Sequence, residues 1–108
     1  MATSYKVLGQ ANPVATTVTT LYTVPAATMS VCSTLAVASL GSSATFRVAV
    51  RPAGATLENK HYIAYDVPVG NADSVFLTLG LSLSSTDVVS VYASTANVSF
   101  SLFGSEVA

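Results

Sequence analysis

Hydrophobic and polar residues alternate along most of this chain with a period of two. Between positions 45 and 51, for example, Phe46 and Val48 fall on one side of an extended backbone and Arg47 falls on the other. Such alternation is typical of antiparallel strands that bury one face and expose the other. The residues that the alternation predicts to face inward are Phe46, Val48, Val50, Leu77, Leu79, Leu81, Leu83, Val98, Phe100 and Leu102.

About eight segments of this kind follow one another, at the spacing expected of a β-sandwich. Asn, Gly, Pro and Ser between the segments favour turns, and the longest loop, 55–60, has room for one helical turn. We therefore predict an all-β fold, a single small antiparallel β-sandwich over residues 1–108, with jelly-roll and immunoglobulin-like topologies both open. The predicted strands span residues 5–10, 17–24, 29–40, 45–51, 61–67, 75–83, 88–94 and 97–103.

Charge is scarce. Charged residues make up 8% of the 108 residues, hydrophobic residues make up 51%, and the formal net charge is −1. Four basic residues are too few for a phosphate-neutralising surface, so we expect no nucleic-acid partner. Ser or Thr interrupts every apolar run, and no apolar segment follows Lys6, so we expect neither a membrane span nor a signal peptide.

Few residues are suited to chemistry. The chain has one cysteine and one histidine, so an internal disulfide and an ordinary zinc site are both excluded. Cys32 lies within a predicted strand and is expected to be a buried hydrophobe, whereas His61 is expected at the edge of a loop. No glycine spacing matches a phosphate-binding loop. We therefore predict no enzyme activity, no cofactor and no metal.

The outward positions of the predicted strands carry Ser, Thr and Ala, and charged residues that guard sheet edges are rare. This composition favours self-association, and a simply solvated hydroxyl surface is the alternative. Arg47 and Arg51 share one strand face, where Asp66 could pair with either of them or where they could meet a partner subunit. The five tyrosines could form a carbohydrate- or protein-binding patch, or they could fill the core or its edge; they are Tyr5, Tyr22, Tyr62, Tyr65 and Tyr92. Arg47, Arg51, Tyr62, Tyr65 and Asp66 are thus the candidate partner interface.

Several segments together carry a family resemblance. They are YKVLGQ (5–10), TLYTVP (20–25), FRVAVRPAG (46–54), KHYIAYD (60–66), TDVVSVYAS (86–94) and FSLFGSE (100–106). The set resembles small virion structural proteins of tailed phages, especially phages of cyanobacteria and other aquatic bacteria. These motifs are strand patterns, and no catalytic residue is carried over with them.

The resemblance implies a β-sandwich subunit of the virion, assembled in the host cytoplasm. The first function that the resemblance implies is that of a capsid decoration (cement) protein, which binds the major capsid protein and self-associates, for instance as a homotrimer. A tail, baseplate or fibre-attachment component is the second reading. A glycan- or receptor-binding module that uses exposed tyrosines is the third.

Overall fold

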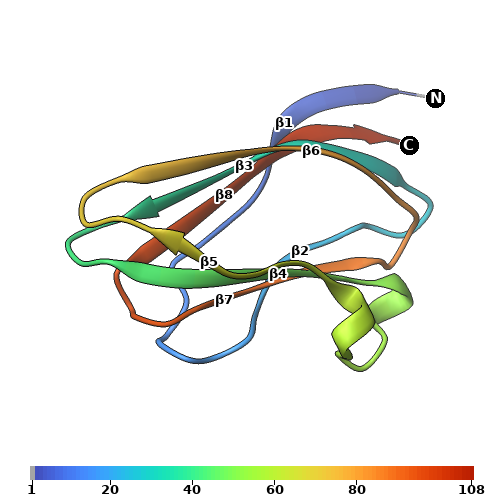
Figure 1. The fold of residues 1–108 in the computed structure, drawn as a ribbon. Coiled ribbons are helices and arrows are strands. Elements are labelled where there is room, and N and C mark those ends of the chain that lie inside the picture. The colour runs from blue at the N-terminus through green and yellow to red at the C-terminus, as the bar shows by residue number, and fades with distance from the viewer. Residues whose placement is uncertain (1) are drawn as a thin grey trace.

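The structure, a computed structural model that describes residues 2–108, consists of two four-stranded antiparallel sheets packed face to face (Figure 1). The predicted β-sandwich of eight strands is confirmed. The second strand is shorter than predicted and the last one longer, because β8 continues past Phe103 as the partner of β1 and β3. The strands are β1 (Thr3–Ala11), β2 (Thr19–Thr23), β3 (Met29–Ser39), β4 (Ala44–Arg51), β5 (Tyr62–Val69), β6 (Ser74–Leu83), β7 (Val88–Ala93) and β8 (Val98–Val107).

The strand order decides between the two topologies that the sequence left open. One sheet has the order β1-β8-β3-β6 and the other β2-β7-β4-β5. The strands therefore pair as nested partners, β1 with β8, β2 with β7, β3 with β6 and β4 with β5. Every connection except the one from β4 to β5 crosses between the sheets. A long hairpin rolled up in this way is a jelly roll.

The core lies between the sheets, and six of the ten residues that the alternation directed inward are buried in it. The other four, Val50, Leu77, Leu79 and Leu81, are partly buried and pack against it. Phe46 and Phe100 meet edge to face, with ring centroids 6.0 Å apart, and both are almost fully buried. Val48, Val98 and Leu102 are also fully buried around them. Leu83 of β6 is buried. The other three leucines of β6 are only half-buried, because β6 is an edge strand. Cys32 is fully buried, as predicted.

One lateral side of the sandwich is closed, where β1 lies against β2. Gly9 of β1 passes so near the backbone of Leu21 in β2 that a Cβ at this position would collide with the Leu21 carbonyl oxygen. At one end of the sandwich, Ala2 and Ala108 lie side by side (Figure 1), and their backbones exchange two hydrogen bonds. The other lateral side carries the edge strands β5 and β6.

The connection from β4 to β5 covers part of the outer face of the second sheet. It contains two short 3-10 turns, Pro52–Gly54 and Asn59–His61, where the sequence suggested one helical turn. The first turn packs against β7 and the second against β4 (Figure 1). Ala49 and Ser90 consequently have only 2% exposure, although the alternation directs them away from the core. His61 ends this loop as predicted, but it is buried and its Nδ1 accepts a hydrogen bond from the Glu58 amide.

Candidate interaction surfaces

Five side chains form a compact group on the uncovered part of the second sheet's outer face, and we call them the Arg47 cluster. The Arg47 guanidinium carbon lies 4.1 Å from the ring centroid of Tyr65 and 4.2 Å from that of Tyr92. Its Nε donates a hydrogen bond of 2.7 Å to Oδ1 of Asp66. Tyr62 completes the cluster by meeting Tyr65 edge to face, with centroids 4.9 Å apart.

A β-bulge in β5 brings the cluster together. Phe46 pairs with Val67 and Val48 pairs with Ala64, so that two residues of β5, Tyr65 and Asp66, lie opposite Arg47 alone. Asp66 has a φ of 52°, a conformation that Asp tolerates better than most side chains. Both bulge residues are exposed, which breaks the alternation of β5 at this point. The bulge therefore presents a ring and a carboxylate to one guanidinium.

The cluster is electrically balanced and rigid. The hydrogen bond from Arg47 to Asp66 raises the pKa of the guanidinium, and the two groups form an ion pair of opposite formal charge. Two flanking rings and one carboxylate hold the arginine in a single arrangement. Next to it, Asn59, Tyr62 and Tyr65 line an open hollow of about 410 Å³. Aromatic rings, an amide and an ordered ion pair together suit a ligand or partner that is polar but uncharged.

The partner interface predicted from the sequence contains four of the five members of this cluster. Arg47, Tyr62, Tyr65 and Asp66 are brought together, and the cross-strand pair considered for Asp66 forms with Arg47. Arg51 lies apart, because its guanidinium donates to the Ser90 hydroxyl and to the Ala55 carbonyl and so holds the loop after β4. Tyr92 was named only among the five tyrosines considered for a binding patch, and the pairing of β4 with β7 places it directly beside Arg47. Tyr22 of the same set is buried in the core.

The outer face of the first sheet carries a second candidate surface, which we call the apolar face. Large hydrophobic side chains from all four strands are exposed on it, with Tyr5 at 85% and Phe76 at 69% exposure. Small and hydroxyl side chains lie between them. The members of the apolar face are Tyr5, Val7, Met29, Val31, Phe76 and Phe103.

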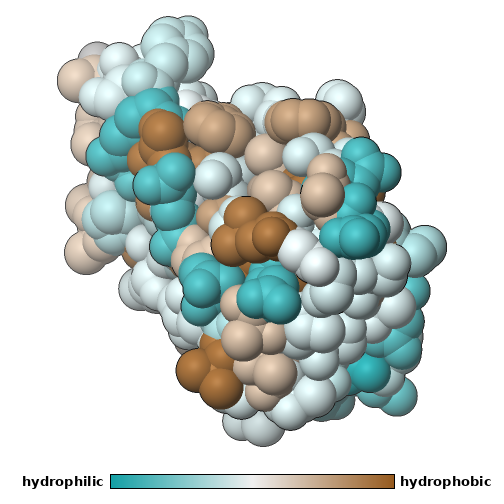
Figure 2. All heavy atoms as spheres, turned by 90° about the vertical axis from the view of Figure 1, so that its left-hand side faces the viewer, coloured by the Kyte–Doolittle hydropathy of each residue, from teal (hydrophilic) through white to brown (hydrophobic). Residues whose placement is uncertain are grey.

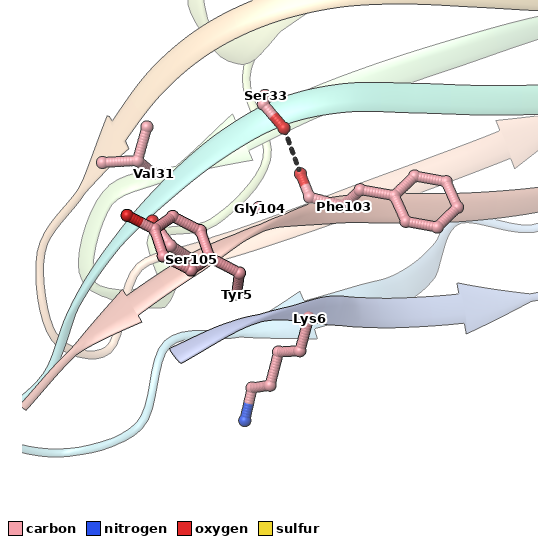
Figure 3. Close-up of a pocket in the computed structure, with 7 residues that line it drawn as sticks. All are labelled: Tyr5, Lys6, Val31, Ser33, Phe103, Gly104 and Ser105. Atoms are coloured by element: carbon pink, nitrogen blue, oxygen red, sulfur yellow. Dashed lines mark hydrogen bonds between the residues drawn. The ribbon is translucent and has the colours of Figure 1, made fainter. Parts of the chain in front are cut away.

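A shallow hollow of about 440 Å³ lies within the apolar face. Tyr5 leans across β8 above Ser105, and Phe103 points in the opposite direction along the strand (Figure 3). Gly104 and Ser33 lie between these rings, and the Ser33 hydroxyl donates to the Phe103 carbonyl. Lys6 also lines this hollow, and its side chain extends away from the two rings (Figure 3).

Charged residues are sparse in this protein and make up 8% of the chain. Figure 2 looks onto the end of the sandwich that is on the left in Figure 1, and most of its atoms are pale, with separate brown hydrophobic groups. Charged side chains cover little of a surface that consists mainly of Ser, Thr, Ala and Gly. Association with another protein therefore removes few charges from water.

A polar group at the end of the sandwich near the termini was not foreseen from the sequence. Glu106 of β8 accepts a hydrogen bond of 2.5 Å from the Tyr22 hydroxyl and pairs with Lys6 Nζ at 2.6 Å. The Tyr22 hydroxyl also meets the buried Ser30 hydroxyl at 2.6 Å. The bond from Lys6, followed by that from Tyr22, lowers the pKa of Glu106. Burial and the Glu106 carboxylate raise the pKa of Tyr22 to about 12.

The remaining titratable groups form no further site that we can identify. No three His, Cys, Asp or Glu side chains gather as a metal site among residues 2–108. Burial raises the pKa of the Cys32 thiol to about 11, which keeps it protonated. No helix within the described part of the chain is long and apolar enough to span a bilayer.

Comparison with known proteins identified no relatives. No protein-family model matches the chain, and it has no significant match among curated proteins or solved structures.

Proposed function

We propose that this chain is a non-enzymatic structural subunit of a tailed-phage virion, in the first place a capsid decoration (cement) protein that binds the major capsid protein and self-associates. The apolar face is the observation that carries this proposal. The family resemblance of the strand segments supplies the virion setting, which the apolar face does not specify.

The physical argument starts from the cost of the apolar face. Tyr5, Phe76 and their neighbours remain in water in the isolated chain, and covering such side chains is favourable by about 25 cal/mol per Å² of apolar area. Exposed apolar side chains that gather on one face of a small protein commonly mark an interaction site, and those of the apolar face come from all four strands of one sheet. A rigid jelly roll can bury this face on a partner without first ordering a loop, which lowers the entropic cost of binding.

The Arg47 cluster supports the same proposal from the opposite side of the sandwich. Tyrosine and arginine are enriched in protein interfaces, and lysine and glutamate are depleted. Tyr65 and Tyr92 already fix the Arg47 side chain, so docking restricts it little further. A subunit with contact surfaces on both outer faces can join two neighbours in a lattice, as a cement protein does.

Labelling of purified particles with gold-conjugated antibody tests the proposal. We expect label distributed over the heads, on particles of the phage that encodes the chain. Label confined to tails or tail tips would overturn the decoration role in favour of a tail, baseplate or fibre-attachment component. Absence of the chain from both intact and disrupted particles would overturn the virion assignment altogether.

A pair of variants tests the role of the apolar face. Tyr5→Lys introduces a charge into the face, and we expect incorporation into particles to fall strongly. Val14→Lys is the matched control, because Val14 is 70% exposed but lies in the loop between β1 and β2. Equal incorporation of both variants would show that the apolar face is not the attachment surface.

The hollow beside Tyr62 favours a second candidate function, recognition of a neutral saccharide. Sugars offer hydroxyl groups for the Asn59 amide and C–H faces for tyrosine rings, and the balanced Arg47–Asp66 pair adds no net charge. Calorimetry with host cell-surface polysaccharide tests this candidate, with Tyr65→Ala expected to abolish binding and Tyr5→Ala to leave it intact. Absence of heat with the unaltered protein would exclude it.

A further inference from the structure

We propose that β6 is a self-pairing edge, at which two copies of this chain join their β6 strands antiparallel about a two-fold axis at Phe76. The two β1-β8-β3-β6 sheets then become one continuous sheet. This inference deepens the self-association within the proposed function, and it names the strand, the register and the partner.

The four edge strands of the two described sheets differ in how they are protected. β5 contains Asp66, Pro68 and two register shifts, all of which oppose pairing with another strand. β2 has only five residues. β1 carries Lys6 and lies against β2 at Gly9. β6 has ten residues and contains neither a charged residue nor a proline.

The regular part of β6 is its first half. Residues from Ser74 to Thr78 pair with β3 without interruption, and the register shifts only afterwards, opposite Ser33. Phe76 is the middle residue of this regular segment. It points away from the core and is 69% exposed, whereas Val75 and Leu77 on either side of it are half-buried against the core.

The segment is complementary to itself in the antiparallel sense. With the two-fold axis at Phe76, Ser74 faces Thr78 of the second copy, Val75 faces Leu77, and Phe76 faces Phe76. Hydroxyl thus opposes hydroxyl, aliphatic opposes aliphatic and ring opposes ring, which are favourable cross-strand pairs. No like charges meet, because the strand has none. The unpaired backbone N–H and C=O groups of this edge can hydrogen-bond to another β-strand. The favourable cross-strand pairs indicate that this strand is β6 of a second copy of the chain.

Engineered cysteines test the register. In the proposed dimer the two Cβ atoms at position 76 lie about 4.5–5.5 Å apart, near the span of a disulfide. We expect Phe76→Cys to form a covalent dimer on mild oxidation. Thr78→Cys is the matched control on the same strand and face, and it should remain largely unlinked because it faces Ser74. Cys32 is fully buried and does not compete. Equal cross-linking of both variants, or none at position 76, would overturn the register.

Charge substitutions test the pairing without covalent capture. We expect the unaltered chain to be dimeric by light scattering coupled to size exclusion, and Phe76→Lys and Phe76→Glu each to be monomeric. An equimolar mixture of these two variants should recover a dimer, because opposite charges then face each other. A mixture that stays monomeric, or an unaltered chain that is monomeric at all concentrations tested, would overturn the inference.

The two proposals fail separately. A Phe76→Lys variant that keeps its oligomeric state would show association through another surface, which overturns β6 pairing and leaves the virion proposal standing. Absence of the chain from particles, together with cross-linking at position 76, would overturn the virion proposal and leave β6 pairing intact.

Discussion

Arg47 and Asp66 are joined by a 2.7 Å hydrogen bond between Nε and Oδ1, although 19 residues separate them in the chain. The bulge in β5 makes this contact, since it places both Tyr65 and Asp66 opposite Arg47. A regular strand would have turned one of them toward the core. The local irregularity of β5 therefore creates the cluster that we assign to partner contact.

Reversing the charge at Arg47 tests that assignment. Arg47→Glu places two carboxylates together and removes the cation from between two tyrosine rings, so we expect assembly into particles to weaken. The fold should persist, because the ion pair is at the surface and such pairs contribute little to stability. Particle incorporation and a thermal melt are the two measurements. Arg51→Glu should also weaken assembly, through loosening of the loop that Arg51 holds. If both variants were incorporated into particles normally, the prediction that these arginines contribute to assembly would be wrong.

The packing of Phe100 against Phe46 leads to a prediction on stability. Phe100→Ala should lower the free energy of unfolding by about 3–5 kcal/mol, because it leaves a cavity at the centre of the core. Val14→Ala, at an exposed loop position, should change it by less than about 0.5 kcal/mol. Urea melts of the two variants provide the comparison. A loss below about 1 kcal/mol for Phe100→Ala would mean that the core can collapse around the missing ring.

The Glu106 carboxylate makes stability depend on pH in the acid range. Its pKa is lower in the folded chain than in the unfolded chain, mainly because Lys6 and Tyr22 donate hydrogen bonds to it. Its contribution is therefore fully present above the unfolded value of about 4.3 and is lost as the pH falls through the folded value. Glu106→Gln should flatten the pH profile of the urea midpoint in this window. An unchanged profile would show that Glu106 is not the group responsible.

A glycine near the end of β8 supplies a backbone test. A Cβ at Gly104 would collide with the carbonyl oxygen of Val31 on the neighbouring strand, whereas a Cβ at Gly41 would meet no atom within 4 Å. Gly104→Ala should thus lower the thermal midpoint clearly, and Gly41→Ala should leave it close to that of the unaltered chain. Similar midpoints for both would indicate that β8 can move away from β3 at little cost.

The alternation of side chains was enough to predict the sandwich and the part of its core that β4 and β8 supply. It correctly placed Phe46, Val48, Phe100 and Leu102 inside, because each strand has one face against the other sheet. It could not distinguish a jelly roll from an immunoglobulin-like order, since strand pairing depends on contacts between residues far apart in the chain. The alternation also could not predict the burial of Ala49 and Ser90, because a loop, and not the opposite sheet, covers them.

The candidate sites were predictable only in part, for a similar reason. Arginine, tyrosine and aspartate in a chain with few charges led to the predicted interface, but the bulge that gathers them is a property of the register between β4 and β5. Glu106 had no signal in the sequence, since its partners Lys6 and Tyr22 lie at the opposite end of the chain. Nested pairing of first and last strands is what brings them together.

The most direct test of the central claim, that this is a virion assembly subunit, is sedimentation of the purified chain with phage particles assembled without its gene. We expect the chain to sediment with these particles in a saturable ratio. A chain that stays in the supernatant at every concentration, while remaining folded, would contradict the account.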